Sequence, residues 1–277
     1  MAARHGMAVA TICAHLFCLA CCDRAVAAPA PDIDEQRIAD LVTANHILAD
    51  QGVLDGFGHV SVRSVKNPRH YYMSRSLAPA MVTKDDIMEF DDDSQPIDQR
   101  GRALASERFI HGEAYRARVD VQAVVHSHSP AVLPFSVSSV PLRPLIHTAY
   151  FLGFAPTPVF DIRDAEGADN KMLVNSAKTG AALAKTLGTR AVALMRGHGM
   201  IVVADTLPWV TSRAIYTQQN AQVELEALAL GKPNFLNSYE VNRVDRVERH
   251  WELWAAQANA HALKPRDPAA RRRDAGQ

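Results

Sequence analysis

The chain has 277 residues, with 30 Lys and Arg against 30 Asp and Glu, and 48% of its residues are hydrophobic. Zero formal net charge argues against a nucleic-acid binder, which needs a concentrated basic face. All four cysteines fall within the first 22 residues. The rest of the chain therefore holds no disulfide, zinc–thiolate site or cysteine nucleophile. The 12 histidines become the candidates for metal or proton chemistry.

Residues 1–27 have the features of a secretory signal peptide. An apolar stretch over 7–22 is followed by the small residues Ala25-Val26-Ala27. The stretch is shorter than the roughly 20 apolar residues of a membrane span. A disordered N-terminus, or a lipoprotein acylated at Cys21 or Cys22, are the alternatives. Cleavage after Ala27 leaves 28 basic and 29 acidic residues and no cysteine. We then expect a periplasmic or secreted protein, and otherwise a cytoplasmic one.

The remaining apolar pattern predicts helices alternating with many short strands. The helices are expected over 34–50, 106–118, 176–187, 207–230 and 239–262, and the strands over 59–63, 71–74, 87–90, 121–128, near 159, 191–195 and 200–203. We interpret 28–236 as one α/β domain, with a sheet covered by helices, and 237–264 as its C-terminal helix. Residues 265–277 are predicted to be a disordered tail.

Three histidines stand where a metal site could form. His126 and His128 end an apolar strand, and residues two apart on a strand point to the same face. His198 lies between two glycines in a turn, where its imidazole is accessible. Three imidazoles with an open position are typical of a catalytic metal site.

Glu107 stands at the start of the helix that leads to the strand carrying His126. There it could be a fourth metal ligand, a general base, or both in turn. A carboxylate at a helix N-terminus can also simply stabilise the helix dipole.

Four stretches in this order resemble the class II aldolase/adducin N-terminal domain family, which includes fuculose-phosphate aldolase and ribulose-phosphate epimerase. They are Gly56-Phe57-Gly58-His59-Val60-Ser61-Val62-Arg63, Ser106-Glu107-Arg108-Phe109-Ile110-His111, the run from Arg118 to His128, and Arg196-Gly197-His198-Gly199. The resemblance spans about Arg37 to Pro233. It implies a three-layer α/β/α sandwich around a mainly antiparallel sheet, and a homotetramer with active sites between subunits.

By the same resemblance, His126, His128 and His198 match metal ligands. Glu107 matches an acidic residue that ligates the metal and can move off to shuttle a proton. The metal is expected to be zinc, with manganese, iron or cobalt as alternatives. As a Lewis acid it would stabilise the enediolate formed when a C–C bond beside a carbonyl is cleaved.

The loops that bind phosphate in the sugar-phosphate aldolases are altered in this chain. Gly58 is followed by His59 instead of Asn, and Ser76 by Leu77 instead of Gly. The histidine that precedes a tyrosine in those aldolases is His147, but Thr148 follows it. Substrate-binding candidates are His59, Ser61, Ser74, Arg75, Ser76, Ser106 and His147. Arg75 could meet a carboxylate instead of a phosphate.

The sequence thus predicts a metal-dependent carbon–carbon lyase of the aldolase type, acting on a small hydroxy-carbonyl or sugar-derived substrate. The first alternative is a metal-dependent decarboxylase of a dihydroxy-aromatic or oxo-acid substrate. A non-catalytic adducin-like module and a metal-dependent oxygenase are the others. We expect no nucleic-acid partner, and no membrane partner once the leader is removed.

Several other polar and aromatic residues have a structural interpretation. His111 and Glu113 are expected on a solvated helix face, and Arg63 is expected to support the first loop or pair with an acidic neighbour. Trp251 and Trp254 are expected to pack. Tyr239 is a weaker candidate for reaching a neighbouring subunit's site.

Overall fold

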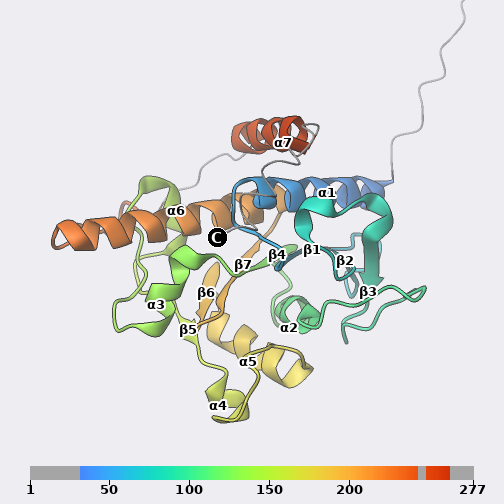
Figure 1. The fold of residues 1–277 in the computed structure, drawn as a ribbon, viewed down its shortest axis with the longest axis horizontal. Helices are drawn as coiled ribbons and strands as arrows, with labels where there is room; N and C mark the ends of the chain where they lie inside the picture. Colours follow the sequence, from blue (N-terminus) through green and yellow to red (C-terminus); the bar gives the residue numbers. More distant parts are fainter. Residues whose placement is uncertain (1–31, 243–247, 263–277) are drawn as a thin grey trace, which may run out of the picture. The chain divides into compact units, whose positions relative to one another are not determined.

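The computed structural model describes residues 32–242 and 248–262, coloured in Figure 1. The predicted signal peptide and the predicted tail lie outside these residues. Within them, no helix is long and apolar enough to cross a membrane.

Seven strands form one sheet in the order β3-β2-β1-β4-β7-β6-β5. They are β1 His59–Arg63, β2 Tyr71–Ser74, β3 Ile87–Phe90, β4 Ala123–Ser127, β5 Val159–Phe160, β6 Val192–Met195 and β7 Gly199–Ala204. The edge pair β5–β6 is parallel and every other pair is antiparallel. The predicted mainly antiparallel sheet is therefore confirmed.

The helices of the described residues are α1 Ile33–Asp50, α2 Arg108–Ala117, α3 Leu133–Val137, α4 Arg163–Glu166, α5 Ala177–Leu187, α6 Leu207–Leu230 and α7 Glu248–Ala262. Short 3₁₀ turns are η1 Pro79–Met81, η2 Lys84–Asp86, η3 Pro130–Val132 and η4 His147–Leu152. Local capping sets several ends. Asp32 caps α1, Ser176 caps α5 and Thr206 caps α6, each through its side chain.

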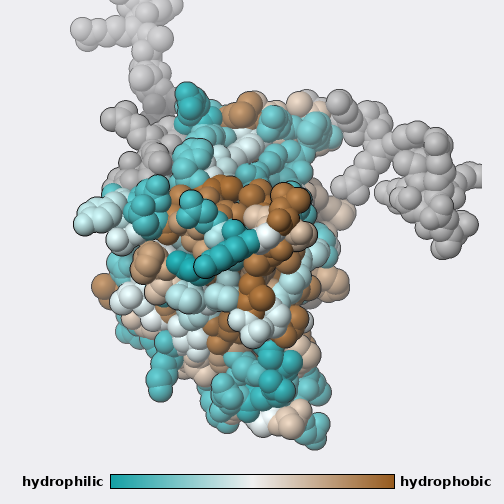
Figure 2. All heavy atoms as spheres, turned by 90° about the vertical axis from the view of Figure 1, so that its left-hand side faces the viewer, coloured by the Kyte–Doolittle hydropathy of each residue, from teal (hydrophilic) through white to brown (hydrophobic). Residues whose placement is uncertain are grey.

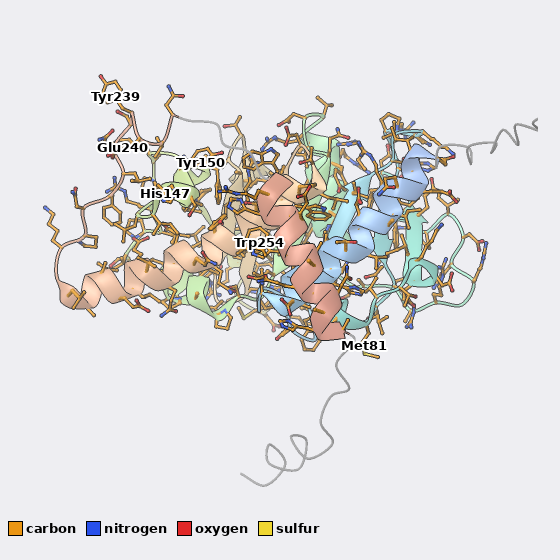
Figure 3. All side chains as sticks on the ribbon, turned by 90° about the horizontal axis from the view of Figure 1, so that it is seen from above. Met81, His147, Tyr150, Tyr239, Glu240 and Trp254 are labelled. Carbon is orange, nitrogen blue, oxygen red and sulfur yellow. The ribbon has the colours of Figure 1, made fainter. Side chains whose placement is uncertain are left out.

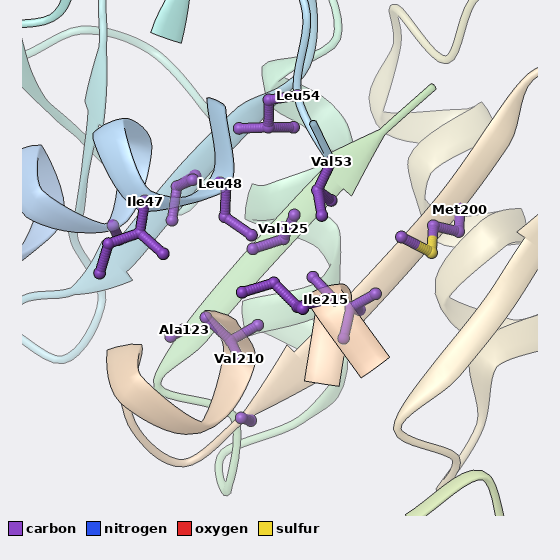
Figure 4. Packing of buried hydrophobic residues seen from close by; sticks show 14 of the residues in the cluster. Ile47, Leu48, Val53, Leu54, Ala123, Val125, Met200, Val210 and Ile215 are labelled. Carbon is purple, nitrogen blue, oxygen red and sulfur yellow. The ribbon is translucent and has the colours of Figure 1, made fainter. Parts of the chain in front are cut away.

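Helices cover both faces of the sheet, which confirms the predicted α/β/α layers (Figure 1). On one face α1, α6 and α7 pack over inward residues such as Val125 and Val202. Figure 4 shows Val125 of β4 between Leu48 of α1 and Ile215 of α6. On the other face α2 and α5 cover Val124 and its neighbours. Adjacent strand residues thus enter opposite cores, as the two-residue period requires.

The C-terminal helix begins later than predicted. Residues 237–242 form turns, in which the Asn237 side chain accepts hydrogen bonds from the Tyr239 and Glu240 amides. An Asn that binds the backbone this way favours a turn over a helix. Helix α7 follows from Glu248 and packs on α1. The predicted packing of the two tryptophans agrees with this, since Trp254 is 8% exposed and stacks on His250.

One side of the molecule carries a band of apolar residues (Figure 2). This is the side to which the C-terminal end of α6 and helix α3 project in Figure 1. The last residue of α6, Leu230, is 92% exposed, and Val137 at the end of α3 is 60% exposed. Contiguous exposed apolar surface of this kind is typical of an interaction face.

Candidate metal centre

Four side chains meet at one end of the central strands. The imidazoles of His126, His128 and His198 and the carboxylate of Glu107 place their ligand atoms within 4.8 Å of one another. Nε2 of His128 lies 3.1 Å from Nε2 of His126 and 3.0 Å from Nε2 of His198. Oε2 of Glu107 lies 3.5 Å from the Nε2 atoms of His126 and His198. All four predicted ligands are therefore brought together.

The cluster fits a small divalent cation. Ligands about 2.0–2.1 Å from a tetrahedral zinc ion stand about 3.3 Å apart, close to the observed separations. Nδ1 of His126 donates to the Met200 carbonyl at 3.1 Å, which leaves Nε2 as the lone-pair atom facing the cluster. Neutral imidazoles facing one another without a cation would have crowded lone pairs. The described residues thus contain a possible metal-binding site.

Glu107 is held in place from behind. It occupies the cap position before α2, is 5% exposed, and its Oε1 accepts the Val174 amide at 3.0 Å. Burial opposes its ionisation, but the contacts with His126 and His198 outweigh burial and hold the pKa of Glu107 well below its usual range. The group is therefore a carboxylate whose second oxygen, Oε2, lies 3.5 Å from Nε2 of His126 and of His198 and can bind a cation placed among them.

Two close backbone approaches bring the ligands together. A Cβ at Gly199, where β7 starts, would overlap the carbonyl oxygen of Ser127 on β4. A Cβ at Gly58 would come within 2.9 Å of the His126 carbonyl, and this residue has φ +87°. Only glycine tolerates these contacts, so the turn carrying His198 can lie directly on the end of β4.

His59 lies beside the cluster without being one of its ligands. It pairs with His126 across β1 and β4, and their ring centroids are 5.6 Å apart. The residue is partly exposed, but its Nδ1 is buried and has no hydrogen-bond partner among the described residues. Burial and the neighbouring His126 lower the pKa of His59 to about 3, so the imidazole is neutral.

The expectation that His111 and Glu113 lie on a solvated helix face is wrong. They are 0% and 6% exposed, because α2 packs closely against both the sheet and α5. Nδ1 of His111 is 2.7 Å from the Ser61 hydroxyl, which is also 2.8 Å from the Tyr115 hydroxyl. Ser61 is fully buried and engaged with these two residues, so it does not face an open substrate site.

The candidates on β2 and before α2 lie at the cluster end of the sheet. Ser61 pairs with Met73, so continuing this antiparallel register places Arg75 beside His59. Arg75 is paired with Asp86 at 2.6 Å. Of the three predicted serines of this region, Ser74 is buried, whereas Ser76 and Ser106 are exposed. The two exposed hydroxyls remain available to a substrate.

His147 does not join the cluster within one chain. Asn220 on α6 accepts hydrogen bonds from the two amides preceding His147, so η4 lies against α6, on the face of the sheet opposite to α2. Figure 3 shows Tyr239 on the same side as His147 and Tyr150. Tyr239 is 89% exposed, and among the described residues no contact joins it or His147 to the cluster.

Arg63 supports the backbone instead of an acidic neighbour. Its guanidinium donates to the carbonyls of Val121, Pro68, Tyr115 and Arg118. These four bonds tie β1 to the loops around it, away from the cluster. Arg63 is a structural residue.

Two large surface cavities lie at the other end of the central strands. One of about 510 Å³ is lined by Arg63 and Gln122, and one of about 580 Å³ by Val121 and Ala204. Neither is lined by a ligand of the cluster. The cavity that includes His198 measures only about 10 Å³. These two larger cavities therefore do not open onto the cluster.

The family model of the class II aldolase and adducin N-terminal domain matches residues 39–225, which include all four clustered residues. The chain belongs to this family. The resemblance first seen in four short stretches is thereby confirmed over most of the described domain.

Two proteins similar to this chain are named as decarboxylases. The chain is 35% identical to decarboxylase tropJ of Talaromyces stipitatus, over 82% of this chain and 95% of that protein. It is 27% identical to 3,4-dihydroxyphthalate decarboxylase of Arthrobacter keyseri, over 69% of this chain and 78% of the relative. L-fuculose 1-phosphate aldolase from Glaciozyma antarctica has a similar structure, with a TM-score of 0.65, 21% identity and coverage of 85% and 93%. That likeness shows the shared fold.

Two contacts that support the cluster could not have been predicted from residue types. Val174 holds Glu107, and Met200 orients His126, but both act through backbone atoms, which any residue type provides. Phe57 is 70% exposed with its ring 6.0 Å from that of His128. An exposed aromatic residue beside the three histidines could have been noted from its place in the first loop.

Proposed function

We propose that the protein is a divalent-metal-dependent decarboxylase of a hydroxylated aromatic acid. The observation that carries this proposal is the convergence of three Nε2 atoms and one carboxylate oxygen at the end of β4. The named activities of the two relatives favour decarboxylation over aldol cleavage. The non-catalytic alternative is disfavoured because a module without chemistry has no need of four converging ligands.

His126, His128, His198 and Glu107 would hold the metal, and zinc suits this nitrogen-rich set best, although manganese, iron and cobalt also bind imidazole. When bound, the cation supplies a Lewis acid that stabilises negative charge on neighbouring substrate oxygens. Such charge develops on the ring and its hydroxyl oxygens when carbon dioxide leaves.

Glu107 is the residue proposed to move the proton. Once moved off the metal site, its Oε2 takes the proton of a substrate hydroxyl, while the Val174 amide stays bonded to Oε1. The bond between the ring carbon and the carboxyl carbon then breaks, and its electron pair stays on the ring. Glu107 returns the proton to that carbon, so one carbon dioxide is released and the carboxylate is restored.

Phe57 supports an aromatic substrate. Its ring is exposed beside His128, and the Asp55 carboxylate fixes the loop by accepting the Phe57 amide at 2.8 Å. A flat substrate ring can stack on such a side chain.

Aldol cleavage of a small hydroxy-carbonyl compound is the second candidate. The exposed hydroxyls of Ser76 and Ser106, with Arg75 nearby, could hold an anionic group at the cluster end of the sheet. A paired screen of hydroxylated aromatic acids and sugar phosphates, with carbon dioxide and aldehyde measured separately, discriminates the two. Aldehyde without carbon dioxide would replace our proposal with this one.

The apolar band of Figure 2 is proposed to be covered by further copies of the chain, as in a homotetramer. A site completed by a neighbouring subunit would explain why Tyr239 and His147 are exposed. For location, we propose export, guided by residues 1–27. Retention of Met1 in the mature protein would contradict it.

The metal is tested first. Purified protein should contain about one divalent ion per chain, and a His126→Ala/His128→Ala double variant should lose it. His70→Ala is the matched control, because His70 pairs with Glu89 on the far part of the sheet. Wild-type protein without metal, and without affinity for zinc, manganese, iron or cobalt, would end the proposal.

A further inference from the structure

We propose that a buried hydrogen-bond relay fixes the tautomer of His59. The relay runs from Tyr115 through Ser61 to His111, and it leaves His59 with an N–H group facing the metal centre. His59 would then donate a hydrogen bond to a substrate oxygen. Only this last step rests on the proposed decarboxylase function.

The donor in each hydrogen bond of the relay is assigned from the number of protons that each hydroxyl can donate. Ser61 contacts both Nδ1 of His111 at 2.7 Å and the hydroxyl of Tyr115 at 2.8 Å. Among the described residues the Tyr115 hydroxyl has no other acceptor, and the side chain is only 5% exposed. In the relay its proton goes to Ser61, because a buried donor without an acceptor is costly, and the same cost requires an acceptor for the Nε2–H group that this direction leaves on His111. Ser61 then donates its own proton to Nδ1 of His111.

His111 is consequently protonated on Nε2. A neutral imidazole has one donor and one acceptor nitrogen, and Nδ1 is already the acceptor. This Nε2 is buried and has no direct hydrogen-bond partner. The remaining buried nitrogen nearby is Nδ1 of His59, which also lacks a partner. The two rings stand edge to face with centroids 5.6 Å apart. One water between the two nitrogens would give Nε2 of His111 an acceptor and Nδ1 of His59 a donor.

His59 thereby receives a bond at Nδ1 and carries its own proton on Nε2. The Nδ1 edge is the buried one, whereas the side chain as a whole is partly exposed. The ring lies beside that of His126, its cross-strand neighbour, with the centroids 5.6 Å apart. A substrate oxygen bound at the cluster would meet an N–H donor there.

The spacing of α2 aligns the relay with the metal centre. Glu107, His111 and Tyr115 are four residues apart, so all three side chains lie on one face of the helix start and its next two turns. That face lies against β1 and β4. The helix thus places Glu107, the proposed metal ligand, and the relay residues His111 and Tyr115 against the same two strands.

Histidine tautomers are measured without substrate or metal. Long-range ¹H–¹⁵N correlation spectra of ¹⁵N-histidine-labelled full-length protein distinguish the two neutral forms, with signals assigned from His59→Asn and His111→Asn variants. We expect His59 and His111 both as the Nε2–H tautomer. In Ser61→Ala, His111 loses its donor and both residues should populate the Nδ1–H form. His59 as Nδ1–H in the wild type, or unchanged tautomers in Ser61→Ala, would overturn the relay.

A tyrosine pair provides the matched control. Tyr115→Phe should also mix the tautomers, whereas Tyr71→Phe should not. Tyr71 is equally buried, and its hydroxyl donates to the Arg108 carbonyl, outside the relay. Equal effects of the two substitutions would show a general packing response and refute the relay.

Steady-state kinetics then test the proposed hydrogen bond from His59 to the substrate. Ser61→Ala should lower kcat/KM by about tenfold, the loss expected for one misdirected hydrogen bond, while retaining one metal per chain. Parallel loss of metal would instead mark Ser61 as merely structural. If the tautomers are as expected but no hydroxylated aromatic acid is turned over, the relay stands and the proposed function fails.

Discussion

Glu224 offers a sharp test of electrostatics inside this fold. The residue is 0% exposed on α6, where its Oε2 accepts a hydrogen bond from the Arg143 amide at 3.0 Å. Its Oε1 has no hydrogen-bond partner in the part of the chain that the structure describes. Burial raises the pKa of Glu224 to about 7, against 4.5 in the unfolded chain, with the Arg143 amide only partly opposing this. The ionised form is therefore the costly one, and Glu224→Gln mimics the protonated form.

The two pKa values of Glu224 determine how the free energy of unfolding changes with pH. Below pH 4.5 the carboxyl is protonated in both states and costs nothing. Between pH 4.5 and about 7 the unfolded chain ionises first, so wild-type stability falls, and above 7 the full penalty remains. A shift of 2.5 units corresponds to roughly 3 kcal/mol. The advantage of Glu224→Gln should thus grow by about 2–3 kcal/mol from pH 5 to pH 8.

Urea unfolding followed by circular dichroism at both pH values measures this difference. The corresponding gain in Tm at pH 8 is about 5–10 °C for a chain of this size. Glu226→Gln is the control, because Glu226 is exposed on the same helix and accepts only from Gln222. An equal advantage at both pH values, or a variant less stable than the wild type at pH 8, would refute the assigned environment.

Two further substitutions test the metal centre. Gly199→Ala should destabilise the fold by about 1–3 kcal/mol in thermal unfolding and abolish metal binding, because the new methyl group overlaps the Ser127 carbonyl. Gly56→Ala, with open space around it, should do neither, and a Gly199→Ala protein with normal metal content would contradict the packing argument. Phe57→Ala should raise KM for an aromatic acid about tenfold with little change in kcat or metal content. An unchanged KM would exclude stacking on Phe57.

Much of the fold was predictable because its signals are local. The strand over 59–63 and the helix over 207–230 were predicted with the bounds that the structure shows. Apolar periodicity and a capping threonine or a flanking glycine mark such ends. The C-terminal helix was placed too early, because the apolar residues after 239 outweighed the turn-forming Asn237. The small helices α3 and α4 are too short to leave a periodic pattern.

The four residues of the candidate metal cluster were predictable from the sequence, whereas the contacts that support them were not. His126 and His128 share a strand face, and His198 stands out between glycines, so residue type and spacing sufficed. His111 has the same polarity as a solvated histidine, and only the packing of α2 on the sheet shows that it is buried. Ser61 was predicted to bind a substrate anion, but its hydroxyl contacts His111, 50 residues further along the sequence. Contacts between residues so far apart in the sequence produce no local sequence pattern from which they could be predicted.

The cluster also acts on the chain as a whole. Its members come from the start of α2, the end of β4 and the turn before β7, so the ligands span residues 107 to 198. An ion held by all four residues would close loops in the same way as a disulfide, in a stretch of chain that has no cysteine. Unlike a disulfide, this cross-link would open when the free ion becomes scarce. The folding stability of the protein would therefore rise and fall with the supply of its metal.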